Sequence, residues 1–365
     1  MLQIATILTY TFISGIEIFN MKFFIFSFIL TIFQLITLLI SSLTMEINNL
    51  DIINVFARFL SVFTFLCIPS KLSISEDEFK RFMLLISILG LVASLYNMII
   101  NFRQALNILN ISNAYEVSFN SFYLNRNSFA QLLLFSVIAI SFLYNEMQKR
   151  YILFFYIIYF INIFLTLSRT VLVCSIIFLI LSSVIYKRKN IIKSSIIISI
   201  IVISLIILIT IKPEIRNFIV DMVIRKEAGT SGRTQLWSVG IYILNNTNWV
   251  FGIGYITSRD IIKSMGFDLN EFHSFYVETL VGGGIVDLLL HFLILMFIIK
   301  RIRIIYKNDK KIGALYLSAY ISIFIYSLFE SASIFTMGYV GTIFTIFIIT
   351  VPLLYSNNFQ FERTT

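Results

Sequence analysis

Apolar runs of about 17 to 25 residues recur along the whole length of this 365-residue chain. A helix of that length crosses the roughly 30 Å of hydrocarbon in a bilayer and satisfies its own backbone hydrogen bonds. Only 13% of the residues are charged and 58% are hydrophobic, which is too little polar surface for a water-soluble globule. The sequence therefore predicts an all-α, polytopic integral membrane protein in a lipid bilayer.

About eleven such runs are present, and they predict one polytopic domain over residues 1–365. The first run has no basic residue ahead of it and no small-residue cleavage signature, so we expect a retained helix. Between the eighth and ninth runs lies a large connection, residues 212–273. The predicted spans are residues 2–19, 23–44, 50–69, 79–100, 127–145, 151–167, 170–186, 191–211, 274–299, 312–330 and 333–355.

Lys and Arg in the short connections predict the orientation, because cytoplasmic loops retain them. They fall on alternate connections, at Lys22, Lys71–Arg81, Lys149–Arg150, Lys187–Lys193 and Lys300–Lys311. One orientation fits every loop, with the N-terminus outside and the C-terminus in the cytoplasm. The 212–273 loop is then extracytoplasmic.

The formal net charge of +9 follows from this topology, so we expect no nucleic-acid partner. Cys67 and Cys174 both lie inside predicted spans, which favours apolar packing over a disulfide or a metal site. No metal-ligand set is visible in the sequence, and we expect no cofactor.

The large loop contains two amphipathic patterns. Apolar residues at Ile215, Phe218, Ile219, Met222 and Val223 predict a helix lying on the membrane surface. A second helix is predicted from Arg233 through Leu244, with Trp237, Ile241 and Leu244 on one face and Arg233 in the first turn.

Arg233 at a helix start is a candidate anion ligand. The free N–H groups and positive dipole of a helix N-terminus attract anions, and a guanidinium adds two donors suited to phosphate oxygens. Pairing of Arg233 with lipid headgroups is the alternative.

Ionisable residues at the ends of apolar spans are costly, and the topology places several of them on the outer face. Arg169 joins two spans with almost no loop, and Arg126 begins the fifth span. Glu330 closes the tenth span, and His273 and Glu278 open the ninth. Such a set suits transfer from a pyrophosphate-linked donor: arginines stabilise the leaving pyrophosphate, and a His or carboxylate accepts the proton of an attacking hydroxyl. An interfacial anchor is the alternative for Arg169, and a loop-end hydrogen bond is the alternative for His273.

Two further features are predicted to be structural. Asp287 and His291 lie four residues apart on the ninth span, which favours a buried polar pair over catalysis. The run Gly282-Gly283-Gly284 lies in an apolar span without a strand or a lysine, which favours close helix packing over a phosphate loop.

Taken in order, the polar motifs resemble those of the O-antigen ligase and O-antigen polymerase superfamily, over roughly residues 75–330. The order, spacing and common side of the motifs carry the resemblance, although Ser274 stands where the family often has Asn, and many members have a twelfth span. The motifs are Asn125-Arg126-Asn127-Ser128-Phe129-Ala130, Ser168-Arg169-Thr170, Gly232-Arg233-Thr234-Gln235-Leu236-Trp237, Gly252-Ile253-Gly254 and His273-Ser274-Phe275-Tyr276-Val277-Glu278.

The resemblance implies a metal-independent membrane glycosyltransferase of the bacterial cytoplasmic membrane that inverts configuration and takes a glycan on undecaprenyl pyrophosphate as donor. Arg169 and Arg233, with Arg126, would bind the pyrophosphate. His273 would position or deprotonate the acceptor hydroxyl, with Glu278 orienting it. Asn125, Asn127 and Glu330 are further candidates.

The leading hypothesis is a polymerase of repeat units for a capsule, exopolysaccharide or O-antigen, working with a flippase and a chain-length regulator of its pathway. A ligase that transfers finished glycan to another acceptor differs only in that acceptor. A flippase for the same lipid-linked sugars would place charges such as Arg58 and Asp287 along the midplane, whereas most polar candidates here map to one face.

Overall fold

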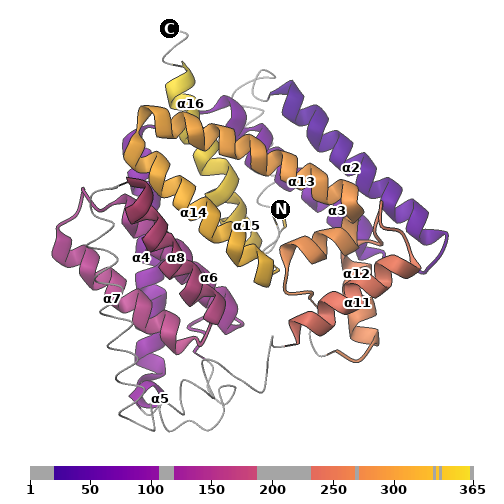
Figure 1. The fold of residues 1–365 in the computed structure, drawn as a ribbon, viewed down its shortest axis with the longest axis horizontal. Coiled ribbons are helices and arrows are strands. Elements are labelled where there is room, and N and C mark those ends of the chain that lie inside the picture. The colour runs from indigo at the N-terminus through magenta and orange to yellow at the C-terminus, as the bar shows by residue number, and fades with distance from the viewer. Residues whose placement is uncertain are drawn as a thin grey trace. The chain divides into compact units, whose positions relative to one another are not determined.

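The computed structural model describes residues 20–106, 119–186, 232–267, 271–331, 334–336 and 339–361. All regular secondary structure in these ranges is helical, which confirms the all-α class (Figure 1). Six helical segments of the described residues are long and apolar enough to cross a membrane. The structure thus supports a polytopic membrane protein, but the predicted total of eleven spans is not confirmed.

Helix α3 continues through a π-helical turn, η2 (Phe63–Cys67), and a short 3-10 turn, η3 (Pro69–Lys71), and α15 joins α16 through a second π-helical turn, η8 (Ile346–Thr350). The helices are α2 (Met21–Ser42), α3 (Leu50–Val62), α4 (Glu76–Ile100), α5 (Phe102–Leu106), α6 (Arg126–Phe142), α7 (Lys149–Leu165), α8 (Arg169–Tyr186), α11 (Arg233–Asn246), α12 (Tyr255–Ser264), α13 (Phe275–Asn308), α14 (Lys310–Phe329), α15 (Tyr339–Thr345) and α16 (Val351–Phe361).

The spans predicted at 2–19 and 191–211, and the amphipathic segment at 215–223, lie outside the described residues. Each of the other predicted spans coincides with a helix. The largest differences are at two places. Helix α13 runs on to Asn308 rather than to 299, because its helical hydrogen bonds continue beyond the apolar pattern, and the described helices of the last span run from Tyr339 to Phe361 rather than from 333 to 355.

The chain divides into two compact units, which are described separately. Unit 1 comprises Met1–Glu76, Gly232–Asn308 and Ser327–Thr365, and unit 2 comprises Asp77–Ser231 and Asp309–Tyr326. In unit 2, α6 packs against α7 and α8. Buried polar groups join its helices: the Tyr159 hydroxyl donates to the Ser87 carbonyl, and the Asn97 amide donates to Asn162 at 2.9 Å.

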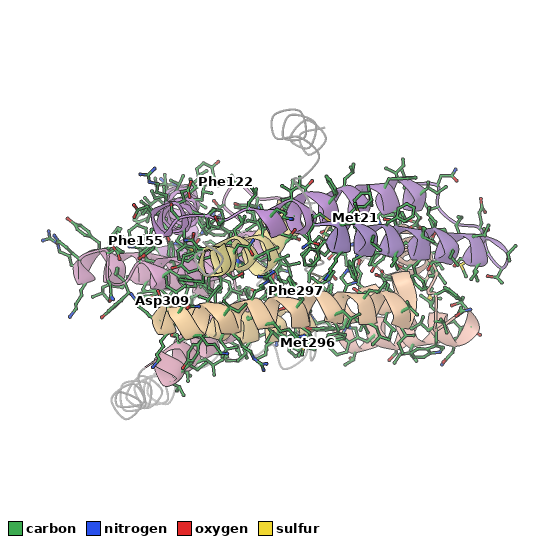
Figure 2. All side chains as sticks on the ribbon, turned by 90° about the horizontal axis from the view of Figure 1, so that it is seen from above. Met21, Phe122, Phe155, Met296, Phe297 and Asp309 are labelled. Atoms are coloured by element: carbon green, nitrogen blue, oxygen red, sulfur yellow. The ribbon has the colours of Figure 1, made fainter. Side chains whose placement is uncertain are left out.

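Helix α2 in unit 1 buries polar side chains and exposes apolar ones, the arrangement that a lipid environment favours. Its buried side includes Thr31, Gln34 and Ser41, whereas Phe28 and Leu39 are more than half exposed. Polar groups point inward because hydrocarbon offers them no hydrogen bonds. Helix α13 shows the same arrangement: Asp287 and His291 are buried, whereas Leu289 and Met296, the latter labelled in Figure 2, are more than half exposed.

Helix α13 is interrupted at Gly284, whose φ of 73° and ψ of −176° are not helical. The loop 249–254 packs into the interruption. Gly254 N–H donates to the Gly282 carbonyl at 2.8 Å, and Ile285 N–H donates to the Trp249 carbonyl at 2.9 Å. The glycine run is therefore a close-packing device, as predicted, although its neighbour is a loop and not a second membrane helix.

We predict that Gly284→Ala destabilises the protein more than Gly266→Ala. Both glycines have positive φ, so alanine carries a backbone cost of about 1–2 kcal/mol at either position. A Cβ at Gly284 would additionally lie 2.1 Å from the Val250 carbonyl oxygen, whereas nothing lies within 4 Å of one at Gly266. Thermal unfolding in detergent measures the difference, and equal midpoints for the two variants would contradict the close packing.

Candidate functional site

Each of the three arginines predicted to bind an anion is the first residue of a helix. Arg126 begins α6, Arg169 begins α8 and Arg233 begins α11. The chain turns into these helices by different means: Asn125 caps α6 by accepting from Ser128 N–H at 2.8 Å, Leu167 has a φ of 54° just before α8, and Gly232 has a φ of 77°. Each arginine therefore lies in the first turn of its helix, at the positive end of the helix dipole.

Unit 2 holds Arg126 and Arg169, and unit 1 holds Arg233. Within unit 2, Asn125 is occupied as a helix cap, and Asn127 is half-buried in the first turn of α6.

Helix α11 is fixed to the segment that precedes His273. The Trp237 indole N–H donates to the Phe272 carbonyl at 2.9 Å, and α11 packs beside the N-terminal end of α13 (Figure 1). The buried face of α11 is formed by Leu236, Gly240, Ile243 and Leu244. The predicted face was therefore partly wrong, because Ile241 is 51% exposed and the helix buries the neighbouring stripe.

Arg233 and His273 share one carboxylate. Arg233 Nη2 lies 2.7 Å from Oε1 of Glu330, and His273 Nδ1 lies 3.8 Å from Oε2 of the same residue. Glu330 is 8% exposed, and Arg233 and His273 are each 18% exposed, so the group is sheltered but open on one side. Glu330, one of the further candidates, thereby brings the predicted anion ligand and the predicted base together.

The backbone holds His273 in an unusual conformation. Its φ is 50°, in the left-handed region that costs a β-carbon-bearing residue free energy. Two residues later, Phe275 N–H donates to the Glu330 backbone carbonyl at 3.1 Å, which ties the start of α13 to the end of α14. Nδ1 of His273 is buried and has no hydrogen-bond partner. A small movement toward Glu330 would complete that bond, as often happens when a substrate binds.

Glu278 contacts a different cation. Its Oε1 accepts from both Nε (2.7 Å) and Nη2 (2.5 Å) of Arg259 on α12. The carboxylate that contacts His273 is thus that of Glu330, where the resemblance had implied Glu278. Burial alone would lower the pKa of Arg259, but the adjoining Glu278 carboxylate raises that pKa above its ordinary value.

Sequence reasoning missed Arg259 and Glu271. Burial and the Glu278 carboxylate raise the pKa of Glu271, while Arg259 and His273 act in the opposite direction, so all four groups share one electrostatic neighbourhood. Both residues lie in a loop whose cations and anions nearly balance, so its charge pattern did not single them out as site residues. Their nearness to the Gly252-Ile253-Gly254 and His273 motifs was the signal available.

A second polar cluster lies deeper in unit 1. Arg58 Nη2 is 3.2 Å from His291 Nε2, and Asp287 lies 3.1 Å from His291 Nδ1 and 3.6 Å from Arg58. The Tyr255 hydroxyl donates to Asp287 at 2.8 Å, and the Gln34 amide donates to it at 3.2 Å. The predicted buried pair of Asp287 and His291 is confirmed, and it is enlarged by partners from α2, α3 and α12. Within the described ranges, no three His, Cys, Asp or Glu side chains are grouped to hold a metal ion.

Residues 153–292 match the family model described as O-antigen ligase. This match confirms the resemblance to the O-antigen polymerase and ligase superfamily. The matched region contains Arg169, Arg233, His273 and Glu278, whereas Arg126 and Glu330 lie outside it. No curated protein matches the chain.

We predict that Asp287→Ala destabilises the protein by about 3–5 kcal/mol, because it leaves the buried Arg58 guanidinium without its carboxylate. Glu146→Ala is the control: it breaks the exposed ion pair with Lys80 and should cost at most about 1 kcal/mol. Thermal unfolding of both variants in detergent tests this difference. A similar small loss for both would mean that the buried cluster contributes little.

The raised pKa of Glu271 predicts a pH-dependent cost of ionisation. A carboxyl group whose pKa is higher in the folded state destabilises the fold as pH rises from its unfolded value of 4.5 through the folded value. Glu271→Gln should therefore raise the unfolding temperature at neutral pH, and its advantage should shrink as pH falls toward 4.5. An advantage that is constant with pH would contradict a shifted carboxyl.

Proposed function

We propose that this protein is a membrane glycosyltransferase that joins lipid-linked oligosaccharide repeat units into a polysaccharide. The donor would be a glycan on undecaprenyl pyrophosphate, and the product a capsule, exopolysaccharide or O-antigen. The proposal rests on the group of Arg233, His273 and Glu330, in which the anion ligand and the base contact one carboxylate. Arg233 and His273 lie within the family-matched residues 153–292.

The chemistry follows from these groups. His273 accepts the proton of an acceptor sugar hydroxyl, and the hydroxyl oxygen bonds to the anomeric carbon of the donor. The bond from that carbon to the pyrophosphate oxygen breaks, and the electron pair leaves with undecaprenyl pyrophosphate. Negative charge grows on the leaving oxygen, where arginines at helix starts stabilise it. A single displacement of this kind inverts the anomeric configuration.

Glu330 suits the task of orienting His273. A carboxylate beside an imidazole fixes the ring and stabilises the imidazolium that forms when the hydroxyl proton is taken. Arg233 on the other oxygen of Glu330 keeps that carboxylate in place. The same guanidinium is proposed to face the pyrophosphate, so proton acceptance and leaving-group stabilisation would act in one small space.

The polymerase and the ligase differ in the acceptor. In a polymerase the acceptor hydroxyl belongs to another lipid-linked repeat unit, and in a ligase it belongs to a lipid or cell-wall component. We place the polymerase first and the ligase second. The proposed site faces outward from the cytoplasmic membrane of a bacterium, where a flippase of the pathway delivers repeat units and a chain-length regulator acts on the product.

A transporter for the same lipid-linked sugars is the third candidate. It would need charged groups lining a central path, and Arg58, Asp287 and His291 are the obvious choices. These three side chains are at most 1% exposed and contact one another. Such a cluster resembles a structural junction more than the lining of a path, which favours the enzyme.

We predict that a strain lacking this protein, complemented with His273→Ala, Arg233→Ala or Arg169→Ala, makes surface glycan of single repeat units. Loss of a general base lowers the transfer rate by about 10²–10⁴-fold. Glycan length on gels is the measurement, with protein level in membranes checked in parallel. Arg303→Ala, an exposed arginine of α13, is the matched control and should restore full-length polymer.

Two results would change the proposal. Long polymer that accumulates on the carrier lipid in the deletion strain would identify a ligase. Full complementation by all three well-expressed site variants would reject the site itself.

A further inference from the structure

Helix α12 is held at its N-terminal turn by a buried carboxylate from α3. Asp51 accepts from Ile256 N–H and Thr257 N–H, each at 2.8 Å, and from the Thr257 hydroxyl at 2.7 Å. Asp51 lies 205 residues before its nearest α12 partner in sequence and is 1% exposed. Such a cap fixes both the position and the rotation of α12.

A second set of contacts, from α13 and from Arg58 on α3, fixes the same turn. The Tyr255 hydroxyl donates to Asp287, the Arg58 guanidinium lies 3.9 Å from the centre of the Tyr255 ring, and Gly254 N–H donates to the Gly282 carbonyl. Helix α12 is therefore attached to two neighbours within its first turn. Arg259 follows Tyr255 by four residues, one helical turn along the same face.

The guanidinium of Arg259 is held along one edge and open at the other. Nε and Nη2 both donate to Oε1 of Glu278, which is fully buried. The Arg259 side chain is 31% exposed, more than that of Arg233. Two contacts to one carboxylate oxygen restrain the plane of the guanidinium and leave the remaining nitrogen, Nη1, outside the pair.

This pair belongs to the neighbourhood of His273. Glu278 N–H donates at 2.9 Å to the carbonyl of Ser274, the residue that follows His273, and the charges of Arg259, Glu278, His273 and Glu330 all act on the pKa of Glu271. Besides the fully buried Arg58–Asp287 pair, the described residues of unit 1 include two partly exposed arginine–carboxylate pairs, Arg233 with Glu330 and Arg259 with Glu278. In each pair the carboxylate is less exposed than its arginine.

We propose that Arg259 is a further ligand of the donor's pyrophosphate, and that Glu278 is the positioning residue that aims Arg259. This inference rests on the proposed function and extends it. Two guanidiniums held separately can each contact one phosphoryl group, so Arg259 would give the site its preference for a pyrophosphate over a monophosphate. Glu278, with Oε1 committed to two donors of Arg259, then has a role other than that of the base.

The test measures binding of undecaprenyl pyrophosphate and of undecaprenyl monophosphate to purified full-length protein in detergent, without any transfer step. The variants are Glu278→Gln, Arg259→Lys and the double variant Arg259→Gln/Glu278→Gln. The double variant removes both charges of the pair together, so it avoids the unpaired buried carboxylate that Arg259→Gln alone would leave. Lys263→Ala, an exposed cation one turn further along α12, is the matched control.

We expect wild type and Lys263→Ala to bind the pyrophosphate more tightly than the monophosphate. Glu278→Gln and the double variant should each bind the pyrophosphate at least about tenfold more weakly, because a charge-assisted contact is lost or misaligned. Monophosphate binding should change less. The two Glu278 variants should lose similar amounts, since Glu278 is proposed to act through Arg259.

Three outcomes would overturn the inference. If the folded double variant binds undecaprenyl pyrophosphate as tightly as wild type does, Arg259 is not part of the site. If Glu278→Gln still binds undecaprenyl pyrophosphate but has lost glycan-transfer activity, Glu278 is a catalytic group and not a positioning residue. If wild type binds neither lipid phosphate, the proposed donor class is wrong and the proposed function fails with it. That result differs from equal binding by wild type and the variants, which would reject only the role of Arg259.

Discussion

Polar groups that enter hydrocarbon must find their partners inside the protein, and this requirement organises unit 1. It turns the polar stripe of α2 inward, so that Gln34 reaches Asp287 and Ser41 reaches the Gly252 carbonyl. The same requirement gathers Arg58, Asp287 and His291 into one cluster. It also explains the interruption of α13: the backbone groups freed at Gly284 are satisfied by the loop that packs against them, and that loop leads directly into α12.

From this junction the positions of the candidate site follow. Helix α12 carries Arg259, and the first turn of α13 carries Glu278, so the contacts that satisfy buried groups also set the Arg259–Glu278 pair. Arg233 and His273 depend on a second set of contacts, from Trp237 to the Phe272 carbonyl and from Phe275 to the Glu330 carbonyl. Positive φ at Gly232 and His273 shows that the chain turns sharply where these side chains are presented.

The sequence predicted features that depend on local pattern. Apolar runs located most of the long described helices to within a few residues, except at the end of α13 and in the last span. Capping logic placed Arg233 at a helix start, because both signals lie within one or two turns of chain. Partners across the fold gave no such signal. Asp51 and its α12 partners are more than 200 residues apart, and Glu278 stands close to His273 in sequence yet pairs with Arg259. The choice of Glu330 over Glu278 as the neighbour of His273 therefore required the structure.

The pairing of arginines with carboxylates has opposing effects on a reaction that expels pyrophosphate. A carboxylate offsets part of the positive charge of its arginine, but without the carboxylate the guanidinium would not be aimed at the anion. It also holds the guanidinium still, so that little reorganisation remains when charge grows on the leaving oxygen. Because only interactions that strengthen in the transition state accelerate a reaction, a restrained and partly neutralised arginine suits leaving-group stabilisation better than a free one. The Arg233–Glu330 and Arg259–Glu278 pairs therefore suit the transfer reaction proposed above.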